Sequence, residues 1–127
     1  MTATFVILGI PATKKNSRRV FRNRRTGAIM LAQSAQACAW EEGAALQMMS
    51  RWHRPALACS VNMAATIYRD RDTGDLLNFL AIVSDALERA KVVENDRQVV
   101  SLDGSRLELD RVRPRVEVTV TWSDGAA

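Results

Sequence analysis

Residues 75–90 constrain the fold most, because nearly every side of this segment is apolar. The stretch DLLNFLAIVSDALERA is long enough for a helix and rich in good helix formers. A helix this apolar needs other structure to cover it, and a β-sheet is a suitable surface. Its apolar residues are Leu76, Leu77, Phe79, Leu80, Ile82, Val83, Ala86 and Leu87.

Four segments have the composition of strands. Residues 116–122, VEVTVTW, alternate between apolar and polar side chains, which is typical of a half-buried strand. Residues 3–9 are apolar and β-branched, with no basic segment before them, so we expect a strand buried on both faces rather than a secretory signal. Residues 60–68 and 99–109 are the remaining expected strands.

A second helix is expected over residues 34–52, with Ser34 as its N-cap. Residues 20–21 are expected to pair with residues 28–31 across a turn at 23–27. The chain is therefore expected to be one α+β domain, residues 1–127, with two main helices packed on a mixed sheet. The helix over 34–52 is expected to bury Ala35, Cys38, Ala39, Ala45, Leu46 and Met49.

Positive charge is concentrated near the N-terminus. Residues 1–40 contain seven basic residues and no acidic one, whereas the rest of the chain has a small negative net charge. A basic arm over about residues 11–31 suggests a polyanion such as DNA or RNA, although a solvated loop without a ligand has the same composition. Its basic residues are Lys14, Lys15, Arg18, Arg19, Arg22, Arg24 and Arg25.

Acidic residues are concentrated in residues 70–100. Asp70, Asp72 and Asp75 lie at the expected end of a strand and the start of the apolar helix, which Thr73 could cap. On an ideal helix, Asn78 and Asp85 project about 60° and about 80° from Asp75, on the same side.

Asp96 follows this helix, with no His or Cys nearby. Converging carboxylates without softer ligands suit Mg²⁺, which activates water at a phosphodiester. Together with the basic arm, they predict a metal-dependent nuclease. Each carboxylate also has a structural interpretation: Asp75 as a helix-start residue, Asp70 and Asp72 as a solvated loop with their Arg neighbours, and Asp96 as a turn residue.

Three segments resemble the RusA-like Holliday junction resolvases. They are GIPATKKNSRRV at 9–20, GDLLNFLAIVSDALERAKVVENDRQVV at 74–100 and RVEVTVTW at 115–122. In that family an Asp-x-Asp-Asn element precedes a Lys, then Asp-Ala-Leu, then a paired Asp-Asp before x-Gln-Val. Asp85 sets the register, which places Asp75 and Asn78 on the first element, and Asn95 and Asp96 on the paired acids.

The resemblance implies a homodimeric, Mg²⁺-dependent endonuclease, with Mn²⁺ as a possible substitute, which resolves four-way junctions in DNA recombination and repair. It implies that Asp75 and Asp96 bind the metal, that Asp85 assists catalysis and that Asn78 supports the site. We also expect a bacterial or phage-encoded cytoplasmic protein with no small-molecule cofactor, and no membrane partner, because no apolar run reaches the roughly 20 residues of a membrane span.

The sequence departs from the family pattern at two positions. The second Asp of the family is Leu77 here, and its Lys is Ala81. One hypothesis is an active enzyme in which Asp70 or Asp72 supplies the missing ligand. The alternative is a protein that binds branched DNA without cutting it. A small RNA-binding domain is a third interpretation of the basic arm, although 6% aromatic residues argue against base stacking.

Overall fold

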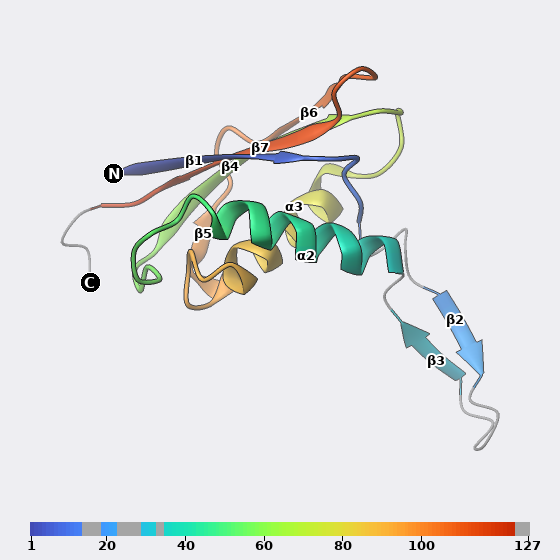
Figure 1. The fold of residues 1–127 in the computed structure, drawn as a ribbon, viewed down its shortest axis with the longest axis horizontal. Coiled ribbons are helices and arrows are strands. Elements are labelled where there is room, and N and C mark those ends of the chain that lie inside the picture. The colour runs from blue at the N-terminus through green and yellow to red at the C-terminus, as the bar shows by residue number, and fades with distance from the viewer. Residues whose placement is uncertain (14–18, 23–28, 33–34, 124–127) are drawn as a thin grey trace.

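The structure contains a five-stranded sheet, and helices α2 (Ala35–Met49) and α3 (Leu76–Arg89) pack against one of its faces (Figure 1). The computed structural model describes residues 1–13, 19–22, 29–32 and 35–123. This architecture confirms the expected α+β class with a mixed sheet and two main helices. None of the helices in the described residues is long and apolar enough to cross a membrane.

Strands β4 (Val61–Arg69) and β7 (Arg115–Thr121) form the centre of the sheet and pair antiparallel. Strand β1 (Thr2–Leu8) adds to the outer edge of β7, also antiparallel. Strands β5 (Val99–Ser101) and β6 (Arg106–Leu109) pair in parallel with successive parts of β4. The alternating residues of β4 and β7 bury one side chain in two under the helices, as the VEVTVTW pattern predicts.

Strand β1 differs from its expected environment, because it is an edge strand. Only Phe5 and Ile7 are buried, whereas Val6 and Leu8 are about half exposed. The free edge at Leu8 is closed by Gln47, whose side-chain amide accepts from the Leu8 N–H at 2.8 Å and donates to its carbonyl at 3.2 Å.

The expected strand over 99–109 is two strands, β5 and β6, separated by residues 102–105. Hydrogen bonds made by side chains, rather than backbone–backbone pairing, attach residues 102–105 to β4. The side-chain oxygen of Asn62 accepts from the Asp103 N–H at 2.9 Å, and the Ser105 hydroxyl accepts from the Ala65 N–H at 3.0 Å.

Helix α2 (Ala35–Met49) buries a different face from the one expected. Of the six residues expected to be buried, only Ala45 is, whereas the others are exposed: Ala35, Cys38, Ala39, Leu46 and Met49. The reason is that small and apolar residues occur all round this helix, so composition alone does not select the face that meets the sheet. The buried residues are Ala37, Trp40, Ala44, Ala45 and Met48.

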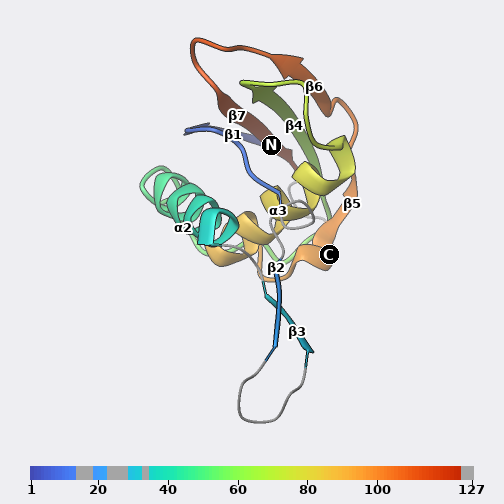
Figure 2. The same cartoon turned by 90° about the vertical axis from the view of Figure 1, so that its right-hand side faces the viewer.

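Helix α3 (Leu76–Arg89) packs on the sheet beside α2, as its apolar composition predicts (Figure 2). Leu77 is the exception, since 71% of it is exposed. The helix buries Phe79, Leu80, Ile82, Val83, Ala86 and Leu87.

The expected hairpin is present as β2 (Arg19–Arg22) and β3 (Ile29–Ala32), which extend away from the sheet and helices (Figures 1 and 2). Its register pairs Val20 with Leu31 and Phe21 with Met30. The expected turn at 23–27 and the expected cap Ser34 lie outside the described residues.

Candidate functional site

The first part of the site is the turn that leads from β4 into α3. Gly74 has φ +91°, and a Cβ on it would lie 2.7 Å from the ring of Phe79, so glycine is needed here for both backbone and space. Asp75 follows in an extended conformation and occupies the N-cap position, which corrects the expectation that Thr73 caps the helix.

The carboxylate of Asp75 makes no capping bond to the helix N–H groups. Its Oδ2 accepts instead from the side-chain amide of Asn78 at 3.3 Å, which agrees with the predicted helical spacing. The Asp75 carboxylate is therefore exposed, held on one side by Asn78, and placed at the positive end of the α3 dipole.

The second part of the site is a contact between α3 and the segment that follows it. Asp96 begins a short 3₁₀ helix, η1 (Asp96–Gln98), and its side chain lies against the Asp85 carboxyl of α3. Glu88, one helical turn after Asp85, accepts a hydrogen bond from the Asp96 backbone N–H at 2.9 Å. Three carboxyl groups therefore gather where α3 meets η1.

Partial burial raises the pKa of the Asp96 carboxyl above its ordinary value. The hydrogen bond with Asp85 raises this pKa further, as do the negative charges of Glu88 and Asp85, while Arg97 opposes the shift. The Asp96 carboxyl thus lies in a field that disfavours its charged form.

A capping box holds Asp96 in place. Asn95 accepts from the Arg97 N–H at 2.9 Å, and its own N–H donates to Gln98 at 2.8 Å. Gln98 also donates to the carbonyls of Leu57 at 2.6 Å and Cys59 at 2.9 Å. These bonds tie η1 to the segment that leads into β4.

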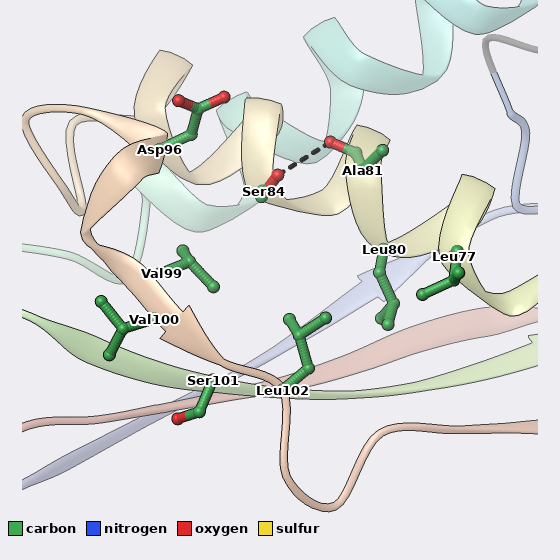
Figure 3. Close-up of a pocket in the computed structure, with 9 residues that line it drawn as sticks. All are labelled: Leu77, Leu80, Ala81, Ser84, Asp96, Val99, Val100, Ser101 and Leu102. Atoms are coloured by element: carbon green, nitrogen blue, oxygen red, sulfur yellow. Dashed lines mark hydrogen bonds between the residues drawn. The ribbon is translucent and has the colours of Figure 1, made fainter.

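A pocket of about 430 Å³ lies between α3 and β5, with Asp96 at one end and Leu77 at the other (Figure 3). Ala81 and Ser84 form part of its α3 wall, and the Ser84 hydroxyl donates to the Ala81 carbonyl at 2.9 Å. The remaining lining is apolar and consists of Leu80, Val99, Val100 and Leu102, together with the partly polar Ser101.

Asp70 and Asp72 are paired within their own turn. Asp72 lies 3.1 Å from the Arg69 guanidinium, and Asp70 lies 3.7 Å from that of Arg71. Arg69 also donates to the carbonyls of Thr73 and Gly74 at 3.2 Å each, which fixes the turn directly before Asp75.

The family profile described as "Endodeoxyribonuclease RusA" matches residues 10–121, which is most of the chain. The chain belongs to the RusA family. No curated protein matches it. The RusA family comprises Holliday junction resolvases, nucleases that act on four-way DNA junctions.

The two departures from the RusA pattern lie in the pocket beside Asp96. Leu77 and Ala81, in the places of the family's second Asp and Lys, are both exposed and both line it. The end of the pocket opposite Asp96 is therefore apolar and uncharged in this member of the RusA family.

The donor chemistry fits a Mg²⁺ site only in part. The carboxylates of Asp75, Asp85, Glu88 and Asp96 are the hard oxygen ligands that this cation takes. Within the described ranges, however, no three Asp, Glu, His or Cys side chains form a group that could hold a metal. Mg²⁺ commonly takes one or two protein carboxylates and fills its remaining positions with water and phosphate oxygens, and Asp96 together with Asp85 meets that requirement. Asp75 is not part of this pair, because about 15 Å of helix α3 separates it from Asp85 at a rise of about 1.5 Å per residue.

The predicted DNA-binding residues are mostly outside the described residues. Arg19 and Arg22 begin and end β2, and the structure describes their backbone only. Those outside are Lys14, Lys15, Arg18, Arg24 and Arg25.

Sequence reasoning did not single out Glu88 or the bonds made by Gln98. Glu88 carries a signal in its spacing, since it lies three residues after Asp85 on the same helix. No local sequence pattern indicates the hydrogen bonds of Gln98, because Leu57 and Cys59 are about 40 residues away in the chain.

Proposed function

We propose that this chain is a Mg²⁺-dependent endonuclease that resolves four-way DNA junctions and acts as a homodimer. The observation that carries this proposal is the contact of Asp96 with Asp85 and Glu88 in a RusA-family chain. Carboxyl groups this close repel one another when ionised, and a divalent cation relieves that repulsion.

The family pattern implies that Asp75 and Asp96 hold the metal. In one copy of the chain they lie at opposite ends of α3, so each would bind a metal with different neighbours: Asp96 beside Asp85, and Asp75 beside Asn78. When bound there, Mg²⁺ would activate a water for attack on the scissile phosphate and stabilise the leaving oxygen. Mn²⁺ prefers similar ligands and could substitute. Asp70 and Asp72 remain candidates for a further ligand, at the expense of their pairs with Arg71 and Arg69.

The other residues of the site would position these ligands. Asn78 orients the Asp75 carboxylate through the 3.3 Å hydrogen bond. Glu88 holds the backbone of Asp96, and Asp85 contacts its carboxyl. The basic arm, residues 11–31, would contact phosphates without reading sequence.

Homodimerisation is part of the proposal because a four-way junction has approximate two-fold symmetry. Two copies related by a two-fold axis present two sites, one for each of two opposed strands. Light scattering on the purified protein with and without a junction measures this state directly.

The experiment is cleavage of a synthetic four-way junction with Mg²⁺ or Mn²⁺, alongside junction binding in EDTA. We expect paired symmetric nicks from the natural protein and none from Asp96→Asn, with binding retained. Asp103→Asn is the matched control, because Asp103 is exposed and its observed bonds to Asn62 are made by its backbone. Nicks that persist in Asp96→Asn would contradict the assignment of Asp96.

A second candidate function is binding of branched DNA without cleavage. The apolar wall at Leu77 and Ala81 favours it, because neither side chain contributes a ligand oxygen or a positive charge. Losing a charge that stabilises the transition state costs about 3 kcal/mol, roughly a hundredfold in rate.

Restoring the family residues separates the two candidates. Leu77 is 71% exposed, so Leu77→Asp combined with Ala81→Lys should leave folding intact. If the natural protein binds junctions without nicking them and the double variant nicks them, the chain is a binding protein on a resolvase fold. Cleavage by the natural protein contradicts the binding-only function.

A further inference from the structure

We propose that the loop between β6 and β7, residues 110–114, is a DNA-contact loop that places Arg111 and Arg113 on phosphates and Val112 against sugar or base surface. This inference rests on the proposed action on DNA junctions and assigns a contact surface separate from the basic arm and the carboxylates.

The exposure of Val112 is the first indication that this loop is a contact surface. It is 95% exposed, the highest value among the large hydrophobic residues that the structure describes. Arg111 and Arg113 on either side of it are exposed as well. An apolar side chain flanked by two cations suits the sugar and base edges between two phosphates, and such side chains also wedge between unstacked bases.

The loop holds these three side chains on a rigid base. One carboxylate oxygen of Asp110 accepts from the Val112 N–H at 3.1 Å and the Arg113 N–H at 3.0 Å. The other accepts from the Arg115 guanidinium at 2.9 Å. The same guanidinium nitrogen donates to the Arg113 carbonyl at 3.0 Å, and Arg115 lies 3.7 Å above the ring of Tyr68.

These bonds also leave the exposed surface of the loop positively charged. The Asp110 carboxylate is engaged by the loop itself and by Arg115. In the part of the chain that the structure describes, no ion pair engages Arg111 or Arg113. The loop therefore presents positive charge without a compensating carboxylate, which favours a nucleic acid over an apolar protein surface.

A groove continues from this loop. Arg113 and Arg51 both line a hollow of about 490 Å³ between β1 and the end of α2. Its described lining contains no acidic residue. Two arginines that line one hollow can contact two phosphates, whereas an isolated surface cation contacts one.

The loop is also joined to the turn that precedes Asp75. The Asp110 N–H donates to the Arg69 carbonyl at 2.8 Å, and the Arg69 guanidinium holds the carbonyls of Thr73 and Gly74 directly before Asp75. DNA held by the loop would thus be held at a fixed position relative to Asp75.

The test compares Arg111→Gln/Arg113→Gln and Val112→Ser with the natural protein, in EDTA, on a labelled four-way junction and a linear duplex. We expect the double Arg variant to reduce the slope of log Kd against log salt by about 2, one for each lost phosphate contact. We expect Val112→Ser to bind the junction about tenfold more weakly with an unchanged salt slope. The duplex should show a smaller loss with Val112→Ser.

Arg106→Gln and Leu46→Ser are the matched controls. Arg106 is exposed on β6 and paired with Glu108 at 3.1 Å, and Leu46 is 67% exposed on α2. Both should bind as the natural protein does, and circular dichroism should show that all variants are folded. Unchanged binding in the loop variants, with a natural protein that binds junctions normally, overturns this inference and leaves the proposed function standing. A natural protein that binds no junction overturns both.

Discussion

Glu88 and Asp96 are joined by a 2.9 Å hydrogen bond from the backbone N–H of Asp96 to the carboxylate of Glu88. This bond fixes the start of η1 to the last turn of α3, beside the contact between Asp85 and Asp96. One acidic side chain therefore orients the backbone of the candidate ligand while its charge opposes ionisation of that ligand. Replacing Glu88 with Gln separates these two effects.

Glu88→Gln keeps an acceptor for the Asp96 N–H and removes the negative charge. The pKa of Asp96 should therefore fall towards its ordinary value, because one of the charges that raises it is gone. A carbon-detected NMR titration of the Asp96 carboxyl without divalent ions measures this change. Glu94→Gln is the control, since Glu94 is exposed and is not among the groups that shift Asp96. An equal pKa in Glu88→Gln and the natural protein contradicts the prediction.

Gln98→Leu should destabilise the fold by about 1–3 kcal/mol, because the carbonyls of Leu57 and Cys59 lose their donor. Gln98→Glu is the matched variant. It keeps an acceptor for the Asn95 N–H but places a negative charge against both carbonyls. Its loss of stability should therefore be greater at pH 7 than at pH 4. Urea unfolding at the two pH values measures both effects, and a stability unchanged in both variants would show that these bonds contribute nothing.

Asp110→Asn should lower stability at neutral pH more than at acidic pH. The Arg113 N–H, and after it Arg115, hold the pKa of Asp110 below its ordinary value in the folded protein. A lowered folded pKa adds stability that is present above the unfolded value of about 4 and is lost as pH falls through the folded value. The difference in unfolding free energy between the two proteins should therefore shrink between pH 6 and pH 2. A difference that grows over that range contradicts the assigned direction.

Leu87→Ala and Leu77→Ala make a matched pair on α3. Leu87 is 0% exposed, so its truncation leaves a cavity and should cost about 2–5 kcal/mol. Leu77 is 71% exposed, so the same change should cost less than about 1 kcal/mol. Chemical denaturation measures both values. Equal losses would mean that Leu77 packs against a surface that one chain alone does not present.

Much of α3 and its first turn could be predicted from the sequence because the signals are local. The apolar composition of residues 75–90 places the helix on a sheet, and three-residue spacing brings Asn78 to Asp75. The buried face of α2 could not be predicted in the same way. Alanines occur on several sides of that helix, and only the shape of the opposing sheet selects Ala37, Ala44 and Met48 for burial.

The strands likewise differ in how far the local sequence predicts where they begin and end. The alternation of VEVTVTW predicts β7 directly, because a period of two is a property of the strand itself. The break between β5 and β6 depends on Asn62 and Ser105, whose bonds to distant backbone groups replace the ladder. No pattern within residues 99–109 reports those bonds.

The sequence by itself determined the α+β class, the amphipathic central strand, the approach of Asn78 to Asp75, and the family motif around Asp85. Each of these follows from the geometry of a helix or strand, or from residue identities along a continuous stretch. Only the tertiary structure decided that Asp85 and Glu88 meet Asp96, that Leu77 and Ala81 share one pocket with it, and that Arg69 links Asp110 to the turn before Asp75. These contacts join residues from separate elements, and their energies depend on burial and on distances that exist only after the helices have packed on the sheet.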